Sequence, residues 1–345
     1  MRIDFLSPSD PRWKEALSVL CHDTYDLPEY VAACGRHEMS TPTAFYANEG
    51  AQYALIPLLQ RPLPLSLGAP LTWTDATSPY GYSSALLTDQ PEWSFRALAA
   101  FVETCAERSI ISVFVRLHPL FASAAALASA GNVVRHGETV MVDLTLPAEA
   151  LLGQQRSGHE SDIRRLRSQG FTVVVDEWSL YVPFIEIYQE TMLRVGADPY
   201  YLFSSDYFQD LRRALGSHLH LVSVLAPDGA PAAAGLFMEA EGIVEYHLSG
   251  TAGNYRQLAP TKFMLEVAIQ WAKARGNRVL HLGGGVGSRN DALFQFKAGF
   301  SGLRSWFETW RVICDDARYG KLTEDAGVSG ASVDGFFPAY ASKTK

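Results

Sequence analysis

Residues 243–300 hold the clearest pattern in the chain and read IVEYHLSGTAGNYRQLAPTKFMLEVAIQWAKARGNRVLHLGGGVGSRNDALFQFKAGF. A strand pattern, IVEYHLSG, runs into the loop TAGNYRQLAP, and a helix pattern follows at 261–275. A second strand, RVLHL, then leads into a glycine-rich loop. This strand–loop–helix order suits an anion, because the free N–H groups and the dipole of a helix N-terminus favour negative charge.

The start of this helix supplies candidate ligands for a donor phosphate. Pro260 suits the N-terminal position of a helix, and Arg256 adds a positive charge within the loop. The candidate donor-binding residues are Arg256, Thr261, Lys262 and Phe263. An ordinary capped helix without a ligand explains the same pattern, since capped helices are common.

The glycine run GGGVG at 283–287 follows the second strand directly. It is neither GxGxxG opening a long helix nor GxxxxGK[ST], so the sequence predicts no dinucleotide site and no P-loop. Glycines at the end of a strand indicate a sharp turn or a close approach of the backbone. The loop is therefore either a simple turn or a backbone wall against which a substrate lies.

Lys297 lies between Phe296 and Ala298 in the aromatic segment FQFKAGF. Its side chain either covers the phenylalanines and reaches water, or points into a site and stabilises a developing oxyanion. In the second case it needs a nearby carboxylate or carbonyl as a partner, because an unpaired buried charge is costly.

Proton acceptors are harder to choose from sequence alone. The candidates are Glu245, His247, His281 and Asp75, and we name Lys297, Phe296, His281 and Asp75 as the catalytic set. GxSxG is absent, so no covalent serine nucleophile is predicted. No pair of cysteines and no histidine stands at the spacing of metal ligands, so no metal site is predicted.

Two further segments suggest an acceptor site. DATSPYGY at 75–82 is a turn-rich loop, and ESDIRRLRSQG at 160–170 is a basic helix. Each has a bland alternative, a plain turn and a solvated helix face. The candidate acceptor contacts are Tyr80, Tyr82, Arg164 and Arg165, in a cleft where the two halves of the chain meet.

The order of elements indicates a duplication. Both halves show antiparallel strands, then a helix, then a β-branched strand, so we expect an α/β (α+β) protein with mainly antiparallel mixed sheets flanked by helices. The expected divisions are 1–150, 151–320 and a C-terminal tail at 321–345, with a linker near 145–158. A helix at 119–130 and a strand pair near 303–314 complete the prediction.

Composition restricts the class of protein. A chain of 345 residues that is 48% hydrophobic can bury a core in each half. Its net charge of −8 argues against a DNA-binding protein, which usually shows a basic footprint. The N-terminus lacks an apolar signal core, and no stretch reaches the ~18–20 apolar residues of a membrane span, so we expect a cytoplasmic protein with reduced thiols.

These motifs together resemble the Fem-type aminoacyltransferases of the GNAT superfamily. The resemblance lies in YHLSGT, YRQLAPTKFMLEVAIQWAKARG, LHLGGGVG and DALFQFKAGF, and in LPEYV, DATSPYGY, DIRRLRSQGF and ETMLRVGADPYY, across most of 20–312. It implies tandem GNAT-like domains that transfer an amino acid from aminoacyl-tRNA to the peptide stem of a peptidoglycan precursor. In such enzymes the lysine of a Phe-Lys pair holds the acyl carbonyl oxygen, a role that would fall to Lys297.

The chain also departs from the related patterns. Acetyl-CoA sites of GNAT proteins favour R/Q-x-x-G-x-G/A before the helix, and the run from Arg256 to Thr261 has neither glycine. We expect no tightly bound cofactor, and a donor that is either aminoacyl-tRNA, with its acceptor end as a partner, or acyl-CoA. The hypotheses are Fem-like aminoacyl transfer to an amine, acyl-CoA-dependent N-acyltransfer to a peptide or amino sugar, and a non-catalytic binding module on a degenerate GNAT scaffold.

Overall fold

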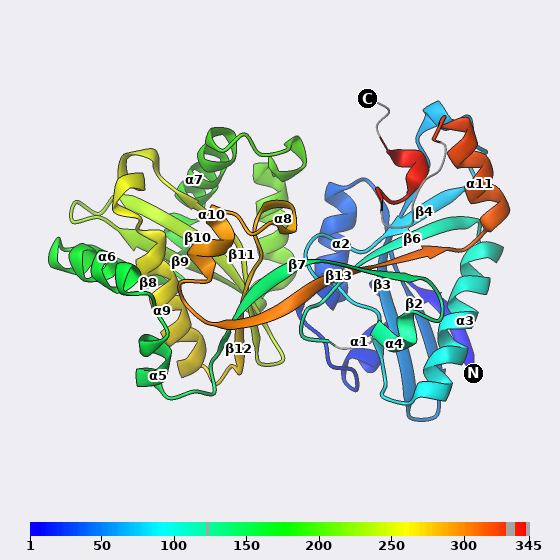
Figure 1. The fold of residues 1–345 in the computed structure, drawn as a ribbon, viewed down its shortest axis with the longest axis horizontal. Coiled ribbons are helices and arrows are strands. Elements are labelled where there is room, and N and C mark those ends of the chain that lie inside the picture. Colours follow the sequence, from blue (N-terminus) through cyan, green and yellow to red (C-terminus); the bar gives the residue numbers. More distant parts are fainter. Residues whose placement is uncertain (122–123, 329–334, 343–345) are drawn as a thin grey trace. The chain divides into compact units, whose positions relative to one another are not determined.

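A computed structural model describes residues 1–121, 124–328 and 335–342, and the chain forms two compact units (Figure 1). Unit 1 consists of residues 1–136 and 306–345, and unit 2 consists of residues 137–305. This division differs from the expected one, because the C-terminal segment belongs to the first unit. The expected linker at 145–158 lies inside unit 2, where AEALLG after Pro147 forms a short helix.

Unit 1 is a mixed, mainly antiparallel sheet with helices. Its strands are β1 (Arg2–Leu6), β2 (Thr41–Glu49), β3 (Gln52–Pro62), β4 (Thr74–Thr77), β5 (Leu86–Leu87), β6 (Ile110–Leu117) and β13 (Leu303–Ile313). Its helices are α1 (Pro11–Leu17), α2 (Pro28–His37), α3 (Pro91–Glu107), α4 (Ala124–Leu127) and α11 (Asp316–Asp325). The strand order is β1-β2-β3-β4-β6-β13, with β5 beside β3, and β4 and β6 form a parallel pair.

Unit 2 repeats this arrangement. Its strands are β7 (Asn132–Asp143), β8 (Thr172–Val175), β9 (Leu219–Leu225), β10 (Pro231–Ala240), β11 (Ile243–Thr251) and β12 (Val279–Gly283). Its helices are α5 (Ala148–Gly153), α6 (Ser157–Ser168), α7 (Tyr181–Arg194), α8 (Ser205–Leu215), α9 (Thr261–Ala274) and α10 (Ala292–Lys297). The order β8-β9-β10-β11-β12-β7 matches that of unit 1, and β11 and β12 form the parallel pair.

The sixth strand of each sheet explains why the expected boundary differs. β7 follows β6 in the chain but pairs with β12 in unit 2, from Val140 to Asp143. β13 follows β12 but pairs with β6 in unit 1. Each unit thus takes its last strand from the segment that follows the other unit's parallel pair. Local sequence patterns carry no sign of such an exchange, which only long-range strand pairing defines.

Several expected elements need correction. The expected helix at 119–130 is helical only at Ala124–Leu127, with residues 122–123 outside the described part. The expected strand pair near 303–314 is the single strand β13, whose partner is β6. Part of the expected loop at 75–82 belongs to β4, because its first residues pair with β3.

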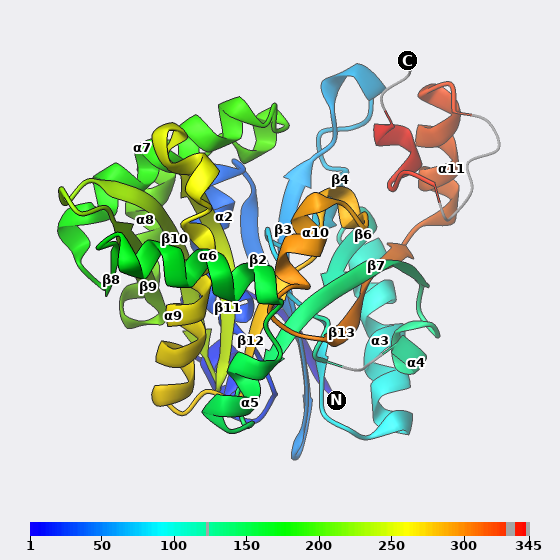
Figure 2. The same cartoon turned by 60° about the vertical axis from the view of Figure 1, so that its left-hand side comes forward.

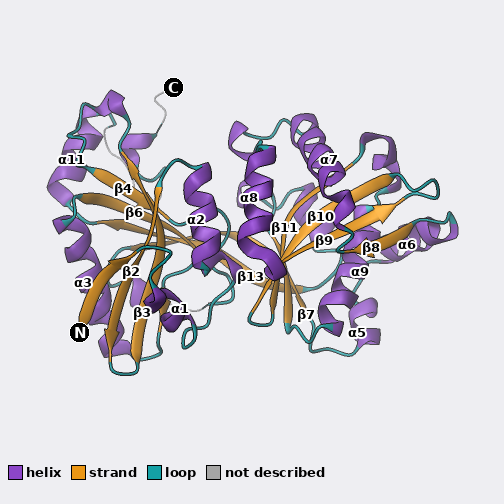
Figure 3. Ribbon diagram, turned by 180° about the vertical axis from the view of Figure 1, so that it is seen from behind, coloured by secondary structure: helices purple, strands orange, loops and turns teal. Residues whose placement is uncertain are grey.

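Helices cover both faces of the unit 2 sheet (Figures 2 and 3). A Cβ added to Gly235 on β10 would meet Met264 of α9, while one added to Gly250 on β11 would meet Ile187 of α7. Because these two positions lie on opposite faces, α9 covers one face and α7 the other. The face under α9 holds the larger apolar cluster, which includes Val244, Phe237, Leu282 and Ile269.

A tight hairpin connects β10 to β11 at Glu241 and Gly242. Both residues have positive φ, 49° and 78° respectively, which is the backbone that two-residue hairpin loops require. The sequence predicts this turn, and it fixes the register of β11 against β10. Among the described residues, no helix has both the length and the apolar character needed to cross a membrane.

The expected C-terminal tail packs into unit 1. Tyr340 is buried in a small cluster with Leu63, Ile111 and Leu322. Its hydroxyl lies 2.8 Å from the Ser112 hydroxyl and donates to Asp75 Oδ2 at 3.4 Å. Residues beyond 320 therefore contribute to the stability of this unit.

Replacing Tyr340 with Phe tests that contribution. Removal of the hydroxyl leaves buried polar groups with fewer partners, so we expect the free energy of unfolding of unit 1 to fall by about 1–2 kcal/mol. Urea denaturation followed by fluorescence measures the change. Tyr53→Phe is the control, because the Tyr53 hydroxyl bonds Glu15 at an exposed site, and it should change stability by less than about 0.5 kcal/mol. Equal effects of the two substitutions would contradict the packing of the tail.

Candidate active site

The parallel strands of unit 2 separate where the glycine loop begins. β11 pairs with β12 from Ile243 opposite Val279 to Glu245 opposite His281. β11 then continues to Thr251, whereas β12 ends at Gly283. Gly283 has a φ of 75°, a conformation that glycine adopts without strain and that turns the chain out of the sheet. The strands therefore diverge, as expected for a sheet that opens to admit a ligand.

Lys297 reaches this opening from α10. Its side chain is buried, and Nζ donates a hydrogen bond to the Gly284 carbonyl at 2.8 Å. Nζ also lies 5.8 Å from the centre of the Tyr246 ring on β11. The alternative in which Lys297 only covers the phenylalanines and reaches water is thus wrong. The expected carbonyl partner for a buried ammonium is present.

Asp291 holds the elements that position Lys297. It caps α10 by accepting a hydrogen bond from the Phe294 N–H at 2.9 Å, and it accepts another from the Val286 N–H at 3.0 Å. One carboxylate therefore fixes both the start of the short helix and the glycine loop. The pKa of Asp291 is lowered, because backbone hydrogen bonds outweigh the effect of its burial.

The buried position changes the acidity of Lys297. Burial lowers the pKa of its ammonium from 10.5 to about 8, although Asp291 and Glu245 favour the charged form. The influence of Glu245 shows that its carboxylate lies within electrostatic range of Lys297. Near neutral pH the group stays mostly charged, which suits a role as a hydrogen-bond donor to an oxyanion.

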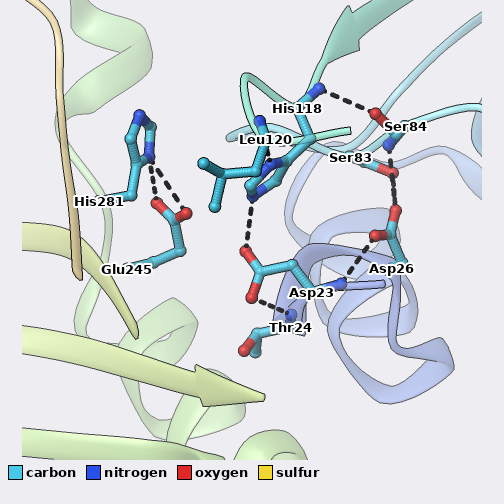
Figure 4. A network of polar contacts seen from close by, with 9 residues as sticks. All are labelled: Asp23, Thr24, Asp26, Ser83, Ser84, His118, Leu120, Glu245 and His281. Carbon is cyan, nitrogen blue, oxygen red and sulfur yellow. Dashed lines mark hydrogen bonds and ion pairs between the residues drawn. The ribbon is translucent and has the colours of Figure 1, made fainter. Parts of the chain in front are cut away.

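Glu245 and His281 form a buried pair at the end of the paired strands (Figure 4). His281 Nδ1 lies 2.8 Å from Glu245 Oε2 and 3.1 Å from Oε1. Their direct opposition in the parallel ladder places both side chains on one face of the sheet. Sequence analysis named both residues as proton acceptors, but it did not predict that they contact each other.

The neighbouring residues of β11 lie at an irregularity in the ladder. Leu236 faces Leu248 and Phe237 faces Tyr246, so His247 is the extra residue of a β-bulge. Burial lowers the pKa of His247 to about 3, which keeps its ring neutral at physiological pH. The Tyr246 hydroxyl bonds Ser249, and the Tyr246 ring stacks on Phe237 on the α9 side.

The start of α9 is more closed than the sequence suggests. The Lys262 N–H donates to the Ala259 carbonyl at 3.1 Å, and the Phe263 N–H donates to the Pro260 carbonyl at 3.0 Å. The expectation that these N–H groups face a ligand unpaired is therefore wrong. A tight turn at Ala259, whose φ is 52°, produces these bonds. As expected, no side chain caps the helix.

The side chains of the candidate donor residues have different surroundings. Lys262 Nζ donates to Asp162 Oδ2 of α6 at 2.6 Å, and the Phe263 ring lies under the Arg167 guanidinium. These contacts join α6 to α9, which Figure 2 shows side by side. Thr261 bonds the hydroxyl of Thr251 at 2.8 Å, and Arg256 is exposed.

The remaining candidates fall into both units. In unit 1, Asp75 forms an ion pair with Arg61 at 2.5 Å, so its carboxylate supports the sheet; burial raises its pKa. Tyr82 packs its ring against Tyr25 and Phe307, and the Tyr80 carbonyl accepts a hydrogen bond from the Tyr30 hydroxyl.

On α6 of unit 2, the candidate arginines are exposed and paired with acids of the same helix. Arg164 pairs with Glu160, and Arg165 pairs with Asp162 at 3.0 Å. Phe296 is half-buried on α10, with its ring 5.7 Å from that of Phe300. The structure therefore brings His281, Phe296 and Lys297 into the neighbourhood of the β11–β12 opening.

Unit 1 holds a separate buried network (Figure 4). His118 Nε2 lies 3.2 Å from Asp23 Oδ2, and its Nδ1 accepts a hydrogen bond from the Leu120 N–H at 3.1 Å. Asp26 accepts hydrogen bonds from the Ser83 hydroxyl and the Ser84 N–H. These bonds tie the turn after α1 to the segment after β4, which agrees with the structural role expected for His118.

The buried ammonium of Lys297 predicts an unusual dependence of stability on pH. Because folding lowers its pKa to about 8, the folded chain holds this proton less tightly than the unfolded chain. The cost of burial is complete below pH 8 and disappears as the pH rises towards 10.5. Lys297→Met should therefore raise the free energy of unfolding of unit 2 at pH 7 by up to about 3 kcal/mol.

Urea denaturation between pH 7 and pH 10 measures this gain and its expected decrease. Lys273→Met is the control, since Lys273 Nζ also donates to a backbone carbonyl, that of Leu144, at 2.8 Å on a less buried part of α9. It should show no such gain. A Lys297→Met protein less stable than the wild type at pH 7 would contradict the cost assigned to the buried charge.

Comparisons with known proteins agree with this architecture. Residues 153–297 match the acetyltransferase (GNAT) domain family, and they lie within unit 2. FemX is similar in fold, with a TM-score of 0.69 and 13% identity over 93% of this chain and 99% of that one. L-PGS from Bacillus licheniformis gives a TM-score of 0.60 and 13% identity, over 92% and 96% of the two chains.

A tandem GNAT protein from the clavulanic acid biosynthesis pathway is also similar, with a TM-score of 0.50 and 12% identity over 91% of this chain and 99% of that one. No curated protein sequence matches the chain significantly. At these identities the solved structures establish the fold, while the family match identifies the domain. The chain is therefore an acyltransferase with a GNAT acetyltransferase domain in residues 153–297 and a tandem GNAT-like fold.

Proposed function

We propose that the chain transfers an aminoacyl group from an activated ester to an amine on a peptide-bearing acceptor. The observation that carries this proposal is the opening between β11 and β12, with the Lys297 ammonium held at its edge by the Gly284 carbonyl. The acyl carbonyl of the donor enters this opening and replaces Gly284 as the acceptor of a Lys297 hydrogen bond.

Lys297 acts on the charge that develops during the reaction. The acceptor nitrogen attacks the acyl carbon, the carbonyl oxygen becomes an oxyanion, and the ester C–O bond then breaks. An ammonium in a buried site stabilises this oxyanion more strongly than one in water, because the local dielectric is low. Phe294 and Phe300, both buried beside α10, exclude water from its surroundings.

The start of α9 favours an aminoacyl ester over acyl-CoA as the donor. Acyl-CoA brings a pyrophosphate, which GNAT proteins bind with free N–H groups at this helix start. Here Pro260 has no N–H, and the N–H groups of Lys262 and Phe263 donate to backbone carbonyls. An aminoacyl ester of a tRNA terminus needs no pyrophosphate site at this position. The family name, acetyltransferase, keeps acetyl-CoA as the second candidate.

The acceptor is proposed from the resemblance to the Fem-type enzymes. Their acceptor is the amine of a peptide stem in a cell-wall precursor, and FemX matches nearly the whole chain in fold. A peptide amine also suits the chemistry of the opening, because the attacking nitrogen must lose protons beside Glu245 and His281. The exposed pairs of Arg164 and Arg165 remain candidate contacts for an anionic part of the acceptor.

A direct comparison of donors tests the proposal. The protein is incubated with lysine-containing cell-wall peptides and either a mixture of tRNAs charged with radiolabelled amino acids or radiolabelled acetyl-CoA. We expect label to appear on the peptide amine from aminoacyl-tRNA and not from acetyl-CoA. Labelling from acetyl-CoA alone would replace the proposed donor with the second candidate. The absence of transfer from both donors to any peptide or amino sugar would contradict the proposed function.

The role of Lys297 is tested by substitution. Lys297→Met keeps the apolar stem and removes the charge, so turnover should fall by about two orders of magnitude while the fold survives, in line with the loss of one oxyanion donor. The control is again Lys273→Met, which removes an ammonium of the same unit away from the opening and should keep turnover. Steady-state rates with the donor identified above measure both. A rate for Lys297→Met close to that of the wild type would refute the assigned role.

A further inference from the structure

We infer that Glu245 and His281 form a proton-accepting pair for the acceptor amine, in which His281 takes the proton and Glu245 is a positioning residue. This inference rests on the proposed acyl transfer and adds how the amine becomes reactive. An aliphatic amine is protonated near neutral pH and has no lone pair for attack until it loses a proton.

The position of the pair in the sheet supports this role. Glu245 and His281 are the last partners of the parallel ladder before β11 and β12 diverge. Their contact therefore lies at the inner end of the opening. The carboxylate of Glu245 is also close enough to Lys297 to affect its pKa. The proton acceptor and the oxyanion donor thus act on the same opening.

The hydrogen bond between the two residues determines the form of the imidazole. An ionised carboxylate can only accept hydrogen bonds, so the 2.8 Å contact with Glu245 Oε2 assigns the ring hydrogen of neutral His281 to Nδ1. The lone pair of the ring then belongs to Nε2, the atom that takes the proton from the amine. When His281 becomes an imidazolium, the adjacent carboxylate stabilises the new charge.

The two faces of β11 separate the two reactants. Successive side chains of a strand point to opposite faces, so Glu245 lies on the face opposite to Tyr246. Tyr246 and Lys297 belong to the α9 side, where the donor enters. Glu245 and His281 belong to the other face, from which the acceptor approaches. Attack on a carbonyl comes from above its plane, so the two reactants need opposite approaches to the opening.

The proton and the bonds balance as follows. Nε2 of His281 takes one proton from the acceptor ammonium, and the neutral nitrogen attacks the acyl carbon. The C–O bond of the tetrahedral intermediate breaks, and the leaving oxygen takes the second proton from the nitrogen. The products are an amide and an alcohol, and the imidazolium returns its proton to water. No oxidant, metal or further reactant is required.

Two acceptors that differ in protonation test this inference. The donor probe is the 3′-O-alanyl ester of adenosine, the terminal group of an alanyl-tRNA. One acceptor is the side-chain amine of N-acetyl-lysine amide, which is protonated at pH 7, and the other is hydroxylamine, which is neutral there. Rates above the protein-free background are measured for the wild type, Glu245→Gln and His281→Gln.

Both variants should lose about a hundredfold in rate with the lysine amine, the usual contribution of a general base. With hydroxylamine, which has no proton to lose before attack, the loss should stay below about threefold. Retained activity with hydroxylamine also shows that the variants fold. Raising the pH should partly restore the rate with the lysine amine, because more of that amine becomes neutral.

His220→Gln is the matched control. His220 is also buried and lies 3.0 Å from a carboxylate, Glu239, on β9 and β10 of the same unit, away from the opening. It should affect both acceptors equally. Equal losses with both acceptors in Glu245→Gln and His281→Gln would overturn the inference and leave the pair a structural role. A wild type inactive with both acceptors would overturn the acyl transfer itself.

Discussion

Beyond Glu245 and His281, the backbone ladder between β11 and β12 stops, and this gap sets the properties of unit 2. The left-handed backbone of Gly283 turns β12 away, while β11 continues alongside β10. α10 then closes back towards the gap and delivers a lysine to it. A sheet without this divergence would pair every backbone group and leave no place for an acyl chain. The proposed chemistry therefore depends on a local failure of strand pairing.

Lys297 illustrates how stability and function oppose each other at this gap. A buried ammonium is costly, and the structure reduces that cost with one carbonyl bond to Gly284 and two carboxylates in range, Asp291 and Glu245. A core built only for stability would hold an apolar side chain at this position. The retained charge is understandable where a reaction develops negative charge on an oxygen. Asp291 links the two demands, because it organises both the loop and the helix.

The sequence predicted much of this local architecture. The strand, loop and helix of residues 243–275 and the hairpin at Glu241 and Gly242 follow from periodicity and turn chemistry, and Lys297 was singled out by its aromatic neighbours. The exchange of β7 and β13 between units was beyond reach, since it depends on pairing between distant segments. The Glu245–His281 contact was missed for the same reason. The closed start of α9 was missed because the tight turn at Ala259 has no glycine to announce it.

The central claim is that Lys297 is a buried ammonium at the opening, and its titration tests this claim directly. The ε-carbon resonance of Lys297, assigned by comparison with Lys297→Met, can be followed by NMR from pH 6 to pH 11 in the full chain. The account predicts a midpoint near pH 8, well below the ordinary 10.5. It also predicts that a bound ester analogue shifts this resonance more than those of other lysines. A midpoint near 10.5 would place the ammonium in water and contradict the proposed site.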